Sequence, residues 1–87
     1  MKFFITHSYY GGDVNIIKQA AKDNNAELIA VKGYALEDFP DDREYVEGSA
    51  EYIFTLERNS KREALQTVDI LIRIRVRELI LAQEASE

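Results

Sequence analysis

The chain's only histidine, His7, lies in the segment with the most varied set of chemically useful side chains. Residues 6–13 read THSYYGGD, so hydroxyl, imidazole and phenol groups precede two adjacent glycines and an acid. A strand that runs into a glycine-containing turn and then a helix can bind phosphate, because backbone N–H groups at a helix N-terminus favour anions. We therefore predict a nucleotide or small-anion site at this turn, with contacts from His7, Ser8, Tyr9, Tyr10, Gly11 and Gly12.

The same segment also has an interpretation without a ligand. It contains neither the GxGxxG pattern nor the Lys-Ser/Thr pair that follows the glycines of a P-loop. Asp13 is a good N-cap residue for a helix, but its charge would repel an anion. An ordinary turn between a strand and a helix explains these residues as well as a ligand site does.

General acid–base chemistry at His7 needs a carboxylate beside it, and Asp13 and Glu63 are the candidates. The chain has no cysteine and no readable Ser-x-x-Lys or Ser/His/Asp arrangement. Because an active site needs several convergent groups, a binding protein is favoured over an enzyme. We assign no catalytic residue, metal or cofactor.

The residues FITHS near the start of the chain, followed by Asp13, resemble the first strand and loop of TIR-type domains. The resemblance covers Phe4 to about Ala21, and the chain is shorter than a complete TIR domain. That family uses a catalytic glutamate, for which Glu63, after YIFTLERNS, is the nearest candidate. A TIR-like enzyme is therefore a further alternative, without the family's NAD cleavage being carried over to this chain.

Three arginines alternate with apolar residues in VDILIRIRVRELIL, residues 68–81. This period-2 pattern and its β-branched residues predict a strand over residues 69–77. The strand would project Arg73, Arg75 and Arg77 from one face, about 6.5–7 Å apart, a spacing close to that of successive phosphates. The same arginines could equally be a solvated face or neutralise acids elsewhere in the protein.

An acidic segment, residues 37–51, is the second candidate surface. Its seven acids and one arginine give it a charge of −6, so the remainder of the chain, whose total is −5, has a charge of +1. The segment could bind a basic protein, and the tyrosines beside it suit an interface. The predicted partner-binding residues are Asp38, Asp41, Asp42, Glu44, Tyr45 and Tyr52.

Length and composition limit the alternatives further. A chain of 87 residues is expected to form a single domain, residues 1–87, with a core small enough that oligomerisation would help it. The absence of cysteine fits a reducing cytoplasm. No apolar run reaches the roughly 18 residues of a membrane span, so we expect no membrane contact. The negative net charge argues against duplex nucleic acid as a partner.

The strand and helix signals together predict an α+β fold. Strands are expected at residues 2–7, 27–32, 50–57 and 69–77, and helices at 14–24 and 61–67. The resulting β-α-β-β-α-β order is that of a ferredoxin-like two-layer sandwich.

The C-terminal segment also allows a second prediction, because Ser60-Lys61-Arg62-Glu63 resembles a capping box and no glycine or proline follows it. In this alternative, a three-stranded βαβ-β sheet carries one long helix over residues 60–84. The main apolar face of that helix would contain Ala64, Leu65, Val68, Leu71, Ile72, Val76 and Leu79, and a second apolar stripe would contain Ile70, Ile74 and Leu81.

The favoured function is a small non-enzymatic binding protein, such as an interaction module, inhibitor or adaptor, that acts as a homo-oligomer. Its expected contact between subunits is the C-terminal strand or helix. A basic protein and a nucleotide are the other expected partners.

Overall fold

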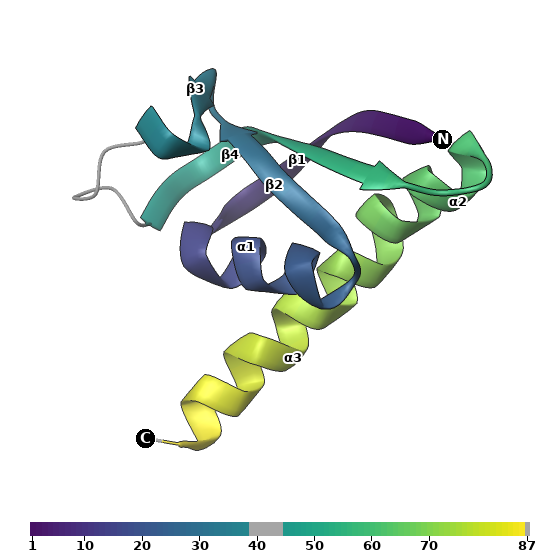
Figure 1. Cartoon of the computed structure of the whole chain (residues 1–87). Coiled ribbons are helices and arrows are strands. Elements are labelled where there is room, and N and C mark those ends of the chain that lie inside the picture. Colours follow the sequence, from purple (N-terminus) through teal and green to yellow (C-terminus); the bar gives the residue numbers. More distant parts are fainter. Residues whose placement is uncertain (39–44, 87) are drawn as a thin grey trace.

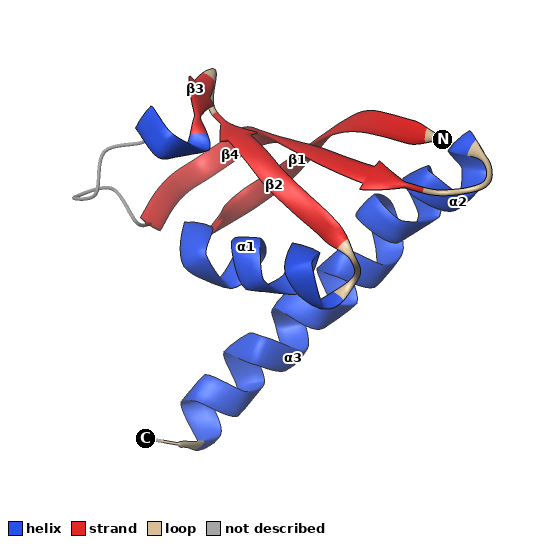
Figure 2. Cartoon of the chain, viewed as in Figure 1, coloured by secondary structure: helices blue, strands red, loops and turns tan. Residues whose placement is uncertain are grey.

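A four-stranded sheet with helices packed against one of its faces forms the fold (Figures 1 and 2). The structure is a computed structural model that describes residues 1–38 and 45–86, with the backbone alone for residues 9–12 and 45–50. The strands are β1 (Lys2–Asp13), β2 (Ala26–Val31), β3 (Tyr34–Ala35) and β4 (Tyr45–Glu57). The helices are α1 (Val14–Asp23), α2 (Lys61–Gln66) and α3 (Ile72–Ala85), with a 3₁₀ turn at Leu36–Asp38 and a π-helical turn at Thr67–Leu71.

The strand order in the sheet is β1-β4-β2-β3, and all neighbouring strands are antiparallel. Because β1 and β2 both run antiparallel to β4, they are parallel to each other with β4 between them. This arrangement confirms an α+β fold, but the predicted ferredoxin-like order is not found. The expected fourth strand at the C-terminus is replaced by a helix.

The register of the sheet stacks one apolar row over all three long strands. Phe54 on β4 is paired with Ile5 on β1 and with Leu28 on β2, and all three side chains are buried. On β2 the register shifts at Ile29, an extra residue relative to β4. This bulge lets Leu28 and Val31, three positions apart, both reach the core, which strict alternation would prevent.

Helix α1 begins where the sequence predicts, because Asp13 caps it. The Asp13 carboxylate accepts a hydrogen bond of 2.8 Å from the backbone N–H of Asn15. The buried residues of α1 repeat at helical spacing and are Val14, Ile17, Ala20 and Ala21. The predicted helix at residues 14–24 is therefore confirmed, and these residues form its core face.

The predicted strand at residues 69–77 is wrong, and the alternative of one long helix describes the chain better. Ser60 begins this helix by accepting a 3.2 Å hydrogen bond from the N–H of Glu63. Three residues at four-residue spacing, Ala64, Val68 and Ile72, are fully buried. The alternation of β-branched residues misled the prediction because it includes exposed residues, Ile70 and Ile74, as well as the buried Val68 and Ile72.

Exposure along the C-terminal helix divides its apolar residues between two faces. Val76 and Leu79 continue the buried face at the edge of the core. Ile70, Ile74 and Leu81 are 48%, 51% and 58% exposed, as expected for the second apolar stripe. A strand would have buried Ile70 and Ile74 with Ile72, whereas the helix turns them away from the sheet.

Arg58 connects the end of the sheet to two turns, and the sequence patterns did not identify it. Its guanidinium donates to the carbonyl oxygens of Asn24 at 2.6 Å, Glu57 at 2.7 Å and Asn25 at 3.4 Å. Its Nε also donates to the Thr67 hydroxyl at 3.2 Å. One side chain thereby joins the α1–β2 turn to the start of the π-helical turn.

Replacing Arg58 by lysine should destabilise the fold by about 1.5–3 kcal/mol, because one ammonium group cannot reach acceptors in so many directions. Urea denaturation measures the change. The exposed Arg62→Lys is the matched control and should alter the unfolding free energy by less than about 0.5 kcal/mol. Equal effects for the two variants would contradict the bridging role.

Alanine substitutions at Ile72 and Ile74 test the helical assignment of residues 69–77. Ile72→Ala should cost about 2–4 kcal/mol, since it leaves a cavity in the core. Ile74→Ala, at a half-exposed position, should cost less than about 1 kcal/mol. Both values come from denaturation of the monomeric state at low concentration, and a strand would make both losses large.

Candidate functional site

His7 lies in a small polar network between β1 and the C-terminal helix. Its Nδ1 is 2.9 Å from Asp69 Oδ1, and its Nε2 is 3.0 Å from Arg73 Nη2. Asp69 and Arg73 are one helical turn apart, so both can face the same strand. His7 occupies an inward position of β1, two residues after Ile5, and its cross-strand neighbour is the buried Tyr52.

The hydrogen-bonding needs of this network are met by a neutral His7 with its proton on Nδ1. In that tautomer Nδ1 donates to Asp69 and Nε2 accepts from Arg73. The His7 side chain is 18% exposed and that of Asp69 is 46% exposed, so the network is at the surface. Thr6 and Ser8 alternate with His7 along β1 and are exposed on the opposite face of the sheet, so neither hydroxyl lies beside the imidazole.

The predicted acid–base partners of His7 are therefore replaced by a different residue. Asp13 caps α1, and Glu63 lies in the first turn of α2. Asp69, which the sequence placed on a strand, supplies the carboxylate. With both ring nitrogens of His7 engaged by the helix, the contacts of this network bind β1 to the helix.

A second ionic contact joins α1 to α3. Arg75 Nε donates to Asp23 Oδ2 at 2.9 Å, and Gln19 Nε2 donates to the other oxygen, Asp23 Oδ1, at 2.8 Å. The hydrogen bond from Arg75, followed by that from Gln19, lowers the pKa of the Asp23 carboxyl below its ordinary value of 3.8. The same contact raises the pKa of Arg75, which also lies 3.5 Å from Glu78 one turn along the helix.

The three arginines do not share a face, contrary to the prediction for a strand. Successive positions i and i+2 on a helix point about 200° apart, so they diverge. Arg75 contacts Asp23 on α1, away from the other two. Arg73 and Arg77, one turn apart, line a hollow on the outer side of α3, and Arg73 at its edge also contacts His7 on β1. The row of guanidinium groups with phosphate spacing is therefore absent.

The segment proposed for anion binding is also placed differently from the prediction. The expected turn at residues 8–12 is wrong, because β1 continues through it to Asp13. The register with β4 shifts between Tyr10 and Gly12. Since the Asp13 carboxylate already accepts from Asn15 N–H, it occupies the helix terminus that an anion would need. Ligand contacts by Ser8, Tyr9, Tyr10, Gly11 and Gly12 stay a prediction.

Only part of the predicted acidic surface lies within the described residues. Asp38 is exposed at the end of the 3₁₀ turn. Tyr45 begins β4, while Asp41, Asp42 and Glu44 lie outside the described residues. Tyr52 is fully buried beneath the helices, so in this fold its ring belongs to the core.

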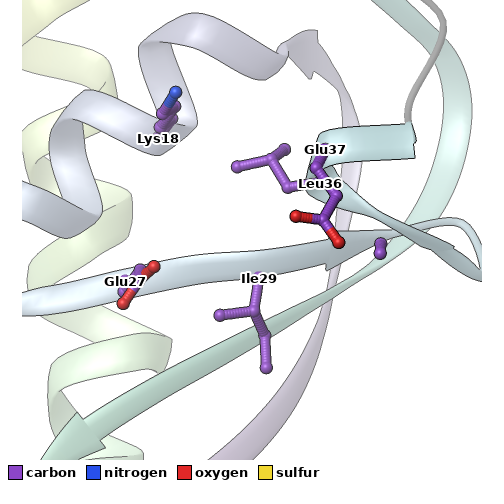
Figure 3. A pocket seen from close by; sticks show the side chains of 6 residues that line it. Lys18, Glu27, Ile29, Leu36 and Glu37 are labelled. Carbon is purple, nitrogen blue, oxygen red and sulfur yellow. The ribbon is translucent and has the colours of Figure 1, made fainter.

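A hollow of roughly 450 Å³ lies between α1, β2 and the 3₁₀ turn (Figure 3). Its lining residues are Lys18, Glu27, Ile29, Ala35, Leu36 and Glu37. The charged side chains of Lys18, Glu27 and Glu37 come from three separate elements. Within residues 1–38 and 45–86, no three His, Asp or Glu side chains are grouped closely enough to hold a metal ion.

The outer side of α3 carries exposed apolar side chains. A hollow there is lined by Arg73, Ile74, Val76, Arg77, Glu78, Ile80, Leu81 and Glu84. Figure 1 shows the C-terminal half of α3 projecting past the sheet and past α1. We call Ile70, Arg73, Ile74, Arg77, Ile80, Leu81 and Glu84 the outward face. None of the described helices is both long and apolar enough to cross a membrane.

The ion pair between Asp23 and Arg75 predicts a pH dependence of stability. A carboxyl group whose pKa is lowered by folding stabilises the fold above its unfolded pKa, near 3.8. This stabilisation is lost as the pH falls from there through the lower folded pKa. Asp23→Asn should thus be less stable than wild type at neutral pH, and the difference should close at acidic pH.

Denaturation of both proteins from about pH 7 to about pH 3 measures this difference. Arg75→Gln provides the matched control, because it removes the other partner of the same ion pair. Its loss of stability relative to wild type should disappear over the same pH range. A wild-type advantage that is constant across the range would contradict the assignment.

Comparisons with known proteins found no match to this chain. No protein-family model matches the sequence, and no curated protein or solved structure matches it significantly.

Proposed function

We propose that this chain is a small, non-enzymatic protein-interaction module whose contact surface is the outward face of α3. The observation that carries the proposal is the exposure of Ile70, Ile74 and Leu81 on one continuous helix whose opposite face is in the core. Apolar residues scattered singly on a surface need no explanation, but a contiguous stripe indicates a contact.

The chemical character of the outward face supports the same function. Its apolar side chains are bordered by Arg73, Arg77 and Glu84, so an apolar centre has a charged rim. The isoleucine and leucine side chains are long enough to fill the groove of another helix, as in helix-in-groove recognition. Because the helix extends past the sheet, a partner could approach it without displacing a core residue.

Other functions have weaker support. The side chains of His7, Asp69 and Arg73 are already engaged in contacts between β1 and the helix. The predicted anion-binding turn is a strand, and its helix terminus is occupied by Asp13. The outward face of α3 is therefore the better candidate for binding.

The double substitution Ile74→Glu/Leu81→Glu should abolish partner binding and leave the fold intact. Both side chains are about half exposed, so the change in unfolding free energy should stay below about 1 kcal/mol. Affinity capture from an extract of the producing cell, followed by mass spectrometry, measures the loss of partner. Capture should fall at least about tenfold, equivalent to roughly 1.4 kcal/mol of binding free energy.

Leu65→Glu is the matched control, because Leu65 is a partly exposed apolar residue on α2 outside the outward face. This variant should retain the partner. The proposal fails if the double variant, shown to be folded by circular dichroism, captures the same proteins as wild type.

A further inference from the structure

Four residues at the projecting end of α3 form a face with an unusual internal symmetry. Arg77 and Glu84 are seven residues apart, about two helical turns or 10.5 Å, and therefore share one side of the helix. Ile80 and Leu81 lie midway between them, on either side of the line that joins them. All four line the same hollow.

The charges at the two ends of this face are opposite and are unused within the fold. Asp23 and Glu78 are the acids that contact Arg75, and His7 contacts Arg73. Among the described residues, neither Arg77 nor Glu84 forms an ion pair. The face thus has a positive end, an apolar centre and a negative end.

We infer that the partner of this face is a second copy of the chain, bound with its α3 antiparallel. A two-fold axis between Ile80 and Leu81 brings these side chains of both copies together in an apolar centre. The same axis places Arg77 of each copy opposite Glu84 of the other. The contact is isologous and closes as a dimer, because both copies use the same surface.

Charge complementarity selects this orientation over the alternatives. A parallel pair would place Arg77 against Arg77 and Glu84 against Glu84, and like charges across an interface are costly. An antiparallel pair centred on Arg77 would also bring the two guanidinium groups together. The axis between Ile80 and Leu81 avoids both conflicts and buries the exposed Leu81.

The antiparallel dimer rests on the proposed interaction function of the outward face, and it is tested with purified full-length protein. Sedimentation equilibrium at about 100 µM should give twice the chain mass of 10.0 kDa. Arg77→Glu and Glu84→Arg, each alone, should raise the dimer dissociation constant about tenfold or more through like-charge contacts. The variant with both substitutions, called the swapped variant, should dimerise like wild type.

Mixing the swapped variant with wild type determines the orientation. In an antiparallel dimer, position 84 of the swapped variant would bring a guanidinium group to Arg77 of wild type, so mixed dimers should be rare. In a parallel dimer the mixed pair would instead be favoured. Native mass spectrometry after subunit exchange, with a tag on one species, counts the two kinds of dimer, and thermal melts show that each variant is folded.

Two results would overturn the inference and can be told apart. A wild-type dimer that exchanges freely with the swapped variant would overturn the antiparallel arrangement and leave the outward face as a contact surface. A wild-type monomer at about 100 µM would overturn self-association altogether. In that case the proposed function would still stand if capture of another protein depended on Ile74 and Leu81.

Discussion

The packing of the C-terminal helix into the core that contains Ile5, Phe54 and Leu28 is the contact on which the rest of the structure depends. The sheet has one apolar face, and α1 alone cannot cover it, because its core side chains are mostly small. Val68 and Ile72 supply the missing volume and are fully buried. Without that helix, the inward side chains of β1 and β4 would be left in water.

Polar contacts on both sides of this packing set where the helix lies. Arg58 joins Thr67 to the α1–β2 turn, and His7 contacts both Asp69 and Arg73 from β1. Arg75 attaches α3 to Asp23 on α1. The π-helical turn at Thr67–Leu71 lies among these contacts, where Thr67 also donates to the carbonyl of Glu63 at 2.9 Å. Such turns are uncommon in helices, and here the turn is held by neighbours from several elements.

Once one face of the helix is committed to the core, the opposite face has no partner within the fold. The sheet is narrow, so α3 extends past it and carries Ile74, Ile80 and Leu81 into solvent. Apolar side chains at such exposed positions do not stabilise the monomer. A long helix with an uncovered apolar face therefore favours a protein contact at the outward face over an anion site at β1.

The sequence by itself determined the local elements whose signals are short in range. Asp13 and Ser60 cap helices as the sequence predicts, and Ile17 and Ala21 are buried at helical spacing on α1. Each of these signals depends on residues within about one or two turns of each other. The long C-terminal helix was also readable as an alternative, from its capping box and its lack of glycine and proline.

Only the tertiary structure decided between strand and helix at residues 69–77, because the β-branched pattern satisfies both periods there. Burial of Ile72 and exposure of Ile74 follow from the sheet that this segment meets, which no local propensity encodes. The pairing of His7 with Asp69 and the bridging role of Arg58 join residues far apart in the chain. Such contacts are selected by packing and hydrogen bonding in the folded state, so residue type and spacing alone could not identify them.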